Sequence, residues 1–152
     1  MSRETLAALE GRIAEQIPLT RHLGFRLLQW RDGELLLEAP LEPNINDKGT
    51  MFAGSQSALL ALGGWALTTL LGEEVTRPLD VVAVRSELEY RAPLTGQARI
   101  RVLAAQADHD RFRERLTARS RASLPVTATA VGPDDAEAAF YKGIYVARQQ
   151  SA

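Results

Sequence analysis

The uncharged run from Gly49 to Gly72 is the feature of this sequence that most constrains the fold. About 20 apolar residues are enough to span a bilayer, so the run is long enough for a membrane helix. It is interrupted by glutamine, serine, threonine and paired glycines, however, and no second apolar span or flanking basic cluster accompanies it. We therefore expect no membrane segment. We expect a helix buried within a domain, which other segments must cover on most sides.

The start of this run is polar and rich in glycine over residues 44–57, which read NINDKGTMFAGSQS. We expect the buried helix to extend from about Gly54 to Leu71, so these polar residues stand where it begins. The first backbone N–H groups of a helix have no partner within it, and they can bind an anion or polarise a carbonyl group. Two compatible interpretations follow: a core helix, and a core helix whose N-terminus also forms a ligand site.

Composition excludes several classes of function. The 152 residues are enough for one domain, which we expect to span residues 1–152. A net charge of -1 gives no general attraction to nucleic acid or to an acidic membrane, so neither is an expected partner. The absence of cysteine excludes thiolate chemistry, and His22 and His109 are too few for a histidine-rich metal site within one chain. The charged N-terminus does not resemble a signal peptide, so we expect a cytoplasmic protein.

Hydrophobic periodicity predicts an amphipathic helix and several strands around the long helix. Residues 3–17 carry apolar side chains at helical spacing, and Pro18 should end that helix. Asp32-Gly33 separates two apolar runs and predicts a hairpin of strands at 23–31 and 34–41. Later strands are predicted at residues 80–91 (with 82, 84, 86, 88 and 90 on one face), 97–105 (with 98, 100, 102 and 104 on one face), 111–122, a stretch led by 126, 128 and 130, and 140–147.

Residues 111–122 contain a stripe of arginines. They alternate with Phe112, Leu116 and smaller residues, and this period of two predicts a strand, although part of the segment would also suit a helix. Asp108-His109-Asp110 is then the turn before the strand. Because the net charge is near zero, we interpret the stripe as a solvent-facing surface and not as a nucleic-acid site.

The order of elements is a helix, two strands, the long helix and then four or five antiparallel strands. An antiparallel sheet curled around the long helix would bury it on most sides, which gives an α+β chain with the hotdog architecture. One flank of the helix and one edge strand would remain open. Pairing of two copies through the strand at 80–91 would cover both, so we expect a homodimer, with a dimer of dimers as a further option.

The pattern N-x-N-x-x-G-T-x-F-x-G-S, which begins at Asn44 and leads into an apolar helix containing Gly64-Trp65, resembles the YiiD C-terminal-type putative thioesterases. Residues 90–96, YRAPLTG, resemble the Y-x-x-P-x-x-G strand end common in the wider hotdog thioesterase superfamily. The resemblance covers roughly residues 20–147. It implies a hotdog fold that hydrolyses acyl-CoA or acyl-carrier-protein thioesters, with the coenzyme A thioester as substrate and with neither a separate cofactor nor a metal.

The chain departs from the superfamily pattern where the chemistry is usually carried. The usual motif is N-x-x-G-x-x-H-G-G, of which Asn46, Gly49 and Gly54 are matches, whereas Phe52 stands where histidine is common. The catalytic carboxylate position further along the helix falls on Ala61. The general base of the best understood relatives is therefore missing, and a hydroxyl position on the next strand that some of them use to hold water falls on alanine, at residue 83.

Thioester hydrolysis needs a polarised carbonyl and an activated water. The N–H groups of Gly54 and Ser55, at the positive end of the helix, are candidates for holding the carbonyl oxygen. Asn46 can orient a water but is not a base, and Asp47 beside it is a candidate base. Carboxylates from the strand of a second copy, at residues 87 and 89, are another route. A serine nucleophile would need a histidine as base, and both histidines lie far away in sequence.

The expected substrate-binding residues flank the start of the helix and the strand that follows it: Asn44, Thr50, Phe52, Ser57, Arg85 and Arg91. The two arginines are candidates for coenzyme A phosphates, because relatives bind the pantetheine arm and the nucleotide along that strand. Structural roles compete with these assignments. Asn44 and Asn46 could simply close Asx turns, and we expect Thr50 or Ser55 to be the N-cap of the helix.

Three functions follow from the resemblance. The first is a homodimeric thioesterase that acts on acyl-CoA or acyl-carrier-protein thioesters. The second is a non-catalytic module that binds or senses acyl-CoA, which the alanines at positions 61 and 83 favour. The third, a hotdog hydratase, usually needs a histidine and a carboxylate in the active-site loop, and this loop lacks the histidine.

Overall fold

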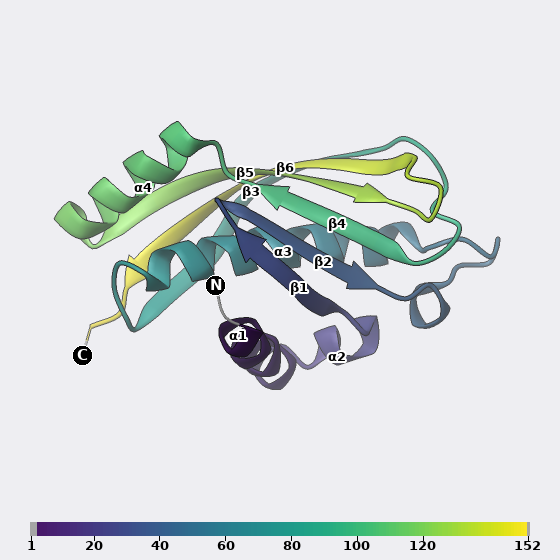
Figure 1. Ribbon diagram of the computed structural model, residues 1–152, viewed down its shortest axis with the longest axis horizontal. Coiled ribbons are helices and arrows are strands. Elements are labelled where there is room, and N and C mark those ends of the chain that lie inside the picture. Colours follow the sequence, from purple (N-terminus) through teal and green to yellow (C-terminus); the bar gives the residue numbers. More distant parts are fainter. Residues whose placement is uncertain (1–2, 152) are drawn as a thin grey trace.

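A curved antiparallel sheet packs around one long helix in the computed structural model, which describes residues 3–151 (Figure 1). The elements across these residues are α1 (Arg3–Gln16), α2 (Leu19–Leu23), β1 (Arg26–Arg31), β2 (Glu34–Ala39), η1 (Glu42–Asn44), α3 (Ala53–Glu73), β3 (Leu79–Tyr90), β4 (Ala98–Leu103), α4 (Gln106–Arg119), β5 (Arg121–Val131) and β6 (Glu137–Gln149). The strands follow the spatial order β1-β2-β4-β5-β6-β3. The long helix α3 runs along the concave side of this sheet (Figure 1).

The first hairpin forms where the sequence predicts it. β1 and β2 pair antiparallel up to Arg31 and Glu34, and the two residues between them, Asp32 and Gly33, have positive φ angles of 52° and 73°. Both central residues of a two-residue type I′ turn need positive φ, which is why an Asp-Gly pair is favoured there. The prediction for the N-terminal side is less accurate, because residues 19–23 form the short helix α2 and β1 begins only at Arg26.

The apolar run forms α3, as predicted, and α3 is covered on most sides. Its buried residues span the whole helix from Gln56 to Gly72. Gly63 and Gly64 permit close approach of the sheet: a Cβ added at Gly64 would lie 2.4 Å from the ring of Tyr145 on β6. Among the half-buried residues of α3, Ala58, Ala61 and Trp65 lie at helical spacing on one flank. The predicted open side of the helix is therefore present. No helix within residues 3–151 combines the length and hydropathy needed to cross a bilayer.

The predicted strand at 111–122 is wrong. Residues 106–119 form the helix α4, and the predicted turn at 108–110 lies within its first turns. Only Phe112 and Leu116 of this helix are buried, and their spacing of four places both on one face against β5. The alternation of arginines therefore reflects exposed positions around a helix and not the pleat of a strand. The helix ends at Ser120, whose φ of 59° is left-handed.

The strand β3 forms as predicted, but a β-bulge changes which side chains share a face. The register shifts between Ala83 and Arg85, so Val82 pairs with Val146 whereas Ser86 pairs with Gly143. Residues 143 and 146 of β6 lie on opposite faces, because faces alternate along a strand. The prediction that 82 shares a face with 86, 88 and 90 is therefore wrong, because residues 81 and 83 lie on that face and residue 84 is the extra residue of the bulge.

Candidate functional site

The loop before α3 is a tight turn that Asn46 closes. The Asn46 side-chain oxygen accepts hydrogen bonds from the backbone N–H groups of Lys48 (2.8 Å) and Thr50 (3.0 Å), and its Nδ2 donates to the Thr50 hydroxyl over 2.9 Å. Gly49, with φ of 79°, supplies the left-handed residue of the turn. The carboxamide of Asn46 is thus engaged in shaping the loop, which is the Asx-turn role considered for it.

Asn44 anchors the base of the same loop. It is 3% exposed, and its Nδ2 donates to the carbonyl oxygens of Leu23 and Pro40, both over 2.9 Å. Its backbone carbonyl accepts from the N–H of Phe52 at 2.8 Å. These bonds tie the loop to α2, to the end of β2 and to the start of α3, so Asn44 fixes where α3 begins.

The helix α3 begins without a side-chain cap. Phe52 occupies the N-cap position, with φ of -56° and ψ of 133°, and makes no side-chain bond to the first turn. The prediction that Thr50 or Ser55 is the N-cap is therefore wrong. Thr50 belongs to the preceding turn, and Ser55 already lies inside the helix.

The first turn of α3 presents open backbone donors. The N–H of Gln56 is the first to bond back, to the carbonyl of Phe52 at 3.1 Å. Within the part of the chain that the structure describes, the N–H groups of residues 53–55 have no hydrogen-bond partner. Gly54 is exposed and Ser55 half-buried, and the Phe52 ring lies against the Gly54 Cα, where an added Cβ would be 2.3 Å away. The N–H groups of the two predicted carbonyl donors are therefore not taken up by other described residues.

Tyr90 completes this end of the helix and was not among the predicted site residues. Its hydroxyl donates to the carbonyl of Ala53 over 2.9 Å. The pKa of Tyr90 is raised overall, because partial burial outweighs the opposite effect of a hydrogen bond with the Ser57 hydroxyl. Tyr90 thus connects the end of β3 to the first turn of α3 beside Ser57. The Y-x-x-P-x-x-G pattern is the sequence signal that contains it, because Tyr90 is its first residue.

The remaining predicted residues lie further from the helix start. Asp47 is exposed and pairs with its neighbour Lys48, with 3.1 Å between Oδ1 and Nζ. Arg91 bonds to Glu89 and to a second carboxylate at residue 137, and its guanidinium lies 5.0 Å from the ring centroid of residue 140. Arg85 follows the bulge, is exposed, and pairs with Ile144 on the face away from α3. The structure does not bring either arginine together with the loop of Asn46.

The two alanines at the usual catalytic positions are located next to polar atoms of other residues. The Ala61 carbonyl, in the middle of α3, accepts a hydrogen bond from the Tyr145 hydroxyl at 2.7 Å. Ala83 lies opposite Tyr145 in the β3–β6 ladder.

Near the helix start, Gln56 is buried and donates to the carbonyl of Met51, while its Oε1 has no partner among the described residues. Over residues 3–151, no group of three histidine, aspartate or glutamate side chains is placed to hold a metal.

Comparison with known proteins identifies the chain's relatives. A sequence model of the family described as putative thioesterase (YiiD C-terminal) matches residues 6–149. The chain belongs to this family. The structure of a putative thioesterase from Shewanella oneidensis has a TM-score of 0.83 at 28% identity, covering 98% of this chain and 100% of that one. The YiiD C-terminal resemblance predicted from the loop motif is thereby confirmed.

Two more distant structures bear only on the fold of this YiiD C-terminal chain. A Chlorobaculum tepidum protein of unknown function has a TM-score of 0.87 at 22% identity, covering 96% of this chain and 95% of that one. A Haemophilus influenzae thioesterase has a TM-score of 0.69 at 11% identity, covering 91% and 87%. The predicted hotdog architecture, an antiparallel sheet around a long helix, is confirmed.

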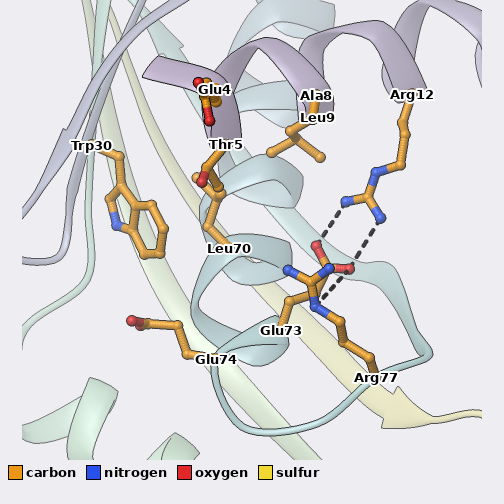
Figure 2. Close-up of a pocket in the computed structure, with 10 residues that line it drawn as sticks. All are labelled: Glu4, Thr5, Ala8, Leu9, Arg12, Trp30, Leu70, Glu73, Glu74 and Arg77. Carbon is orange, nitrogen blue, oxygen red and sulfur yellow. Dashed lines mark hydrogen bonds and ion pairs between the residues drawn. The ribbon is translucent and has the colours of Figure 1, made fainter. Parts of the chain in front are cut away.

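A pocket of this YiiD C-terminal protein lies at the other end of α3. It has a volume of about 490 Å³ and is bounded by α1, Trp30 of β1 and the last turn of α3 (Figure 2). Arg12 reaches across it and holds both carboxylate oxygens of Glu73, at 2.7 and 3.0 Å, with Arg77 on the far side (Figure 2). Because Arg12 and Glu73 are already paired with each other, we interpret the pocket as a packing contact between α1 and α3 and not as a ligand site.

Removing one partner of the Arg12–Glu73 ion pair should destabilise the fold. We expect Arg12→Ala to lower the free energy of unfolding by about 1–2 kcal/mol in urea, because the side chain of Glu73 is only 10% exposed and would lose its main partner. A double-mutant cycle with Glu73→Ala isolates the coupling between the two side chains. The exposed pair Arg101–Glu34 has similar two-bond geometry and is the control, with an expected coupling below about 1 kcal/mol. Equal coupling in both pairs would contradict the expectation.

Proposed function

We propose that this protein hydrolyses acyl thioesters of coenzyme A or of an acyl-carrier protein at the N-terminus of α3. The observation that carries the proposal is the pair of N–H groups at Gly54 and Ser55, which have no partner among residues 3–151 and lie at the positive end of a helix of 21 residues. Such groups stabilise the negative charge that develops on a thioester oxygen during attack. Membership of a family of putative thioesterases supports the same reaction.

The proposal assigns roles to the loop residues around these amides. Asn46 and Asn44 hold the loop in shape through the hydrogen bonds described above, and Asp47 is the carboxylate that this loop carries. We propose Asp47 as the base that activates water. Glu87 and Glu89 are weaker candidates, because their β6 partners place both on the sheet face that points away from α3.

The activity is tested with short-, medium- and long-chain acyl-CoA substrates, and with acyl-carrier protein loaded with the same chains, by detecting the released thiol. We expect turnover with at least one of them, and a lower kcat for Asp47→Asn, with Asp110→Asn, at an exposed aspartate of α4, as the matched control. No turnover above background with any chain on either carrier would refute the enzymatic proposal. Asn46→Ala with unchanged turnover would remove Asn46 from the site.

The second part of the proposal is a homodimer formed through β3. This strand is an edge of the sheet, and it exposes Val82 and Val84, at 55% and 57%. Long exposed edges invite pairing with another chain. Two antiparallel copies of β3 would continue the sheet and bring each copy beside the half-buried flank of the other copy's helix.

Charge introduced on this edge should prevent the dimer. In a two-fold interface the same patch meets itself, so one new lysine places two like charges near each other. We expect the wild type to sediment as a dimer and Val84→Lys to sediment mainly as a monomer at micromolar concentration. Leu103→Lys is the control, because Leu103 is an exposed apolar residue of β4, away from this edge. A monomeric wild type would disprove the dimer.

Binding of acyl-CoA without hydrolysis is the second candidate function. The observation that favours it is the alanine at position 61, where the superfamily pattern has its carboxylate, together with the exposure of Asp47. Titration calorimetry separates the two functions. Micromolar binding of acyl-CoA with no release of thiol would favour the binding module, and failure to bind any acyl thioester would exclude both.

A further inference from the structure

Three hydroxyl groups form a connected chain between β3 and the middle of α3. The Ser86 Oγ lies 3.0 Å from the Tyr141 hydroxyl, which lies 2.6 Å from the Tyr145 hydroxyl. The Tyr145 hydroxyl lies 2.7 Å from the carbonyl oxygen of Ala61. The chain thus begins on the edge strand and ends at the helix position where a carboxylate would be expected.

The hydrogen bonds in this series of hydroxyl groups all run in one direction, because each hydroxyl has only one proton to donate. A carbonyl oxygen only accepts, so the one hydroxyl proton of Tyr145 must point at Ala61. Tyr145 can then only accept from Tyr141, and the Tyr141 proton is in turn committed to it. Ser86 must therefore donate its proton to Tyr141, since two oxygens 3.0 Å apart with no proton between them would repel each other. The remaining lone pairs of the Ser86 Oγ can only accept a hydrogen bond.

Packing holds the two tyrosines in place, so this direction is fixed. Tyr141 is 2% exposed and Tyr145 fully buried. Gly64 and Gly143 make room for them: a Cβ at either glycine would lie within 2.5 Å of a tyrosine hydroxyl oxygen. Burial raises the pKa of Tyr145 well above its ordinary value, so its proton stays in place. Hydrogen bonds in series polarise one another, which makes Ser86 a better acceptor than an isolated serine.

Ser86 faces α3 in an otherwise apolar stretch of β3. Its neighbours on that face are Ala83, beyond the bulge, and Leu88. At one end of the strand Tyr90 bonds to the carbonyl of residue 53, and toward the other end the carbonyl of residue 81 accepts from Trp65. Ser86 therefore lies along the central part of α3, past its N-terminus. Ser86 is exposed, so a ligand can reach this acceptor.

We propose that Ser86 is a specificity residue that accepts a hydrogen bond from a hydroxyl group on the acyl chain of the substrate. The proposal rests on the proposed function, because it requires a thioester held at Gly54 and Ser55. The six residue-to-residue steps from Ser55 to Ala61 rise about 9 Å along the helix, so the recognised hydroxyl belongs several carbons away from the thioester. An acyl chain without a donor would cover the Ser86 lone pairs and leave them unpaired, which disfavours it.

The test compares octanoyl-CoA with octanoyl-CoA hydroxylated at its terminal carbon or at its third carbon. We expect the wild type to prefer the chain hydroxylated at its terminal carbon by about three- to tenfold in kcat/KM, as one added hydrogen bond predicts. The hydroxyl at the third carbon is too near the thioester to reach Ser86 and should give no such preference. Ser86→Ala should abolish the preference and Ser86→Thr should retain it. Tyr141→Phe should also abolish it, although the serine remains, because the Ser86 proton then has no committed partner. Ser123→Ala, an exposed serine of β5, is the matched control.

The outcomes separate this inference from the proposed function. A ratio between hydroxylated and plain chains that is the same in the wild type and in Ser86→Ala overturns the inference alone. A loss of kcat that is equal for all chains would instead mean that Ser86 holds the attacking water, and an equal rise in KM would mean a contact with the pantetheine arm. Both results overturn specificity for the acyl chain. If the wild type binds without turnover, the ratio of dissociation constants replaces kcat/KM. If it neither binds nor hydrolyses any chain, both proposals fall.

Discussion

Ser55→Pro should lower kcat for thioester hydrolysis about 100- to 1,000-fold, because it removes one N–H from the proposed carbonyl site. Ser55 is the third residue of α3, and its N–H makes no hydrogen bond within the described structure. Proline is tolerated in the first turn of a helix, where no i to i-4 bond is lost. The rate should fall while the fold survives, which urea unfolding and circular dichroism can verify.

Two further variants isolate the N–H from the rest of the residue. Ser55→Ala keeps the N–H and removes only the hydroxyl, so kcat should remain within a few-fold of the wild type. Ala53→Pro removes a neighbouring N–H at the first helical position, where Phe52 already has the extended backbone that a residue before proline requires. A wild-type kcat in Ser55→Pro would show that the thioester oxygen binds elsewhere.

Gly64→Ala should destabilise the fold by about 1–3 kcal/mol, the second large effect that we expect. The added methyl group would lie 2.4 Å from the ring of Tyr145, and that ring cannot move aside. It is fully buried, and its hydroxyl is bonded to both Tyr141 and the carbonyl of Ala61. The measurement is the free energy of unfolding in urea, with the m-value checked for two-state behaviour.

Gly11→Ala is the matched control for this substitution. Gly11 lies within α1, and nothing would come within 4 Å of its added Cβ. Alanine is preferred over glycine inside a helix, so this variant should be more stable by about 0.5–1 kcal/mol. The same change thus has opposite signs at the two glycines. A neutral Gly64→Ala would mean that the sheet retreats from α3 at little cost.

Local patterns in the sequence predict the parts of this fold that depend on local causes. The long apolar helix, the Asp-Gly hairpin and the alternating strand β4 each follow from neighbouring residues alone. Helix α4 was missed because its exposed arginines outnumber its two buried residues, so the chance alternation dominated the pattern. The bulge in β3 was missed because it depends on pairing with residues of β6 that lie about 60 positions later in the sequence.

In the candidate site too, the features with local causes could be predicted from the sequence, and those that depend on distant contacts could not. The open amides at the start of α3 follow from helix geometry and were predicted, and the asparagine turn was one of two alternatives. The absence of a side-chain cap was not foreseen, because Phe52 is a poor capping residue by type and its position is set by the bonds of Asn44. The chain from Ser86 through the two tyrosines joins distant strands, and no spacing in the sequence indicates it.

The contact between Gly64 and Tyr145 also constrains how this family can vary. A helix residue without a side chain and a buried aromatic ring on β6 fill one volume between them. Close packing leaves no room for enlarging one without shrinking the other. Homologues with a larger residue at the position of Gly64 should therefore carry a smaller one at the position of Tyr145. In such homologues the series of hydroxyl groups would lose its link to the helix, so the two substitutions should occur together and any preference for hydroxylated acyl chains should be lost with them.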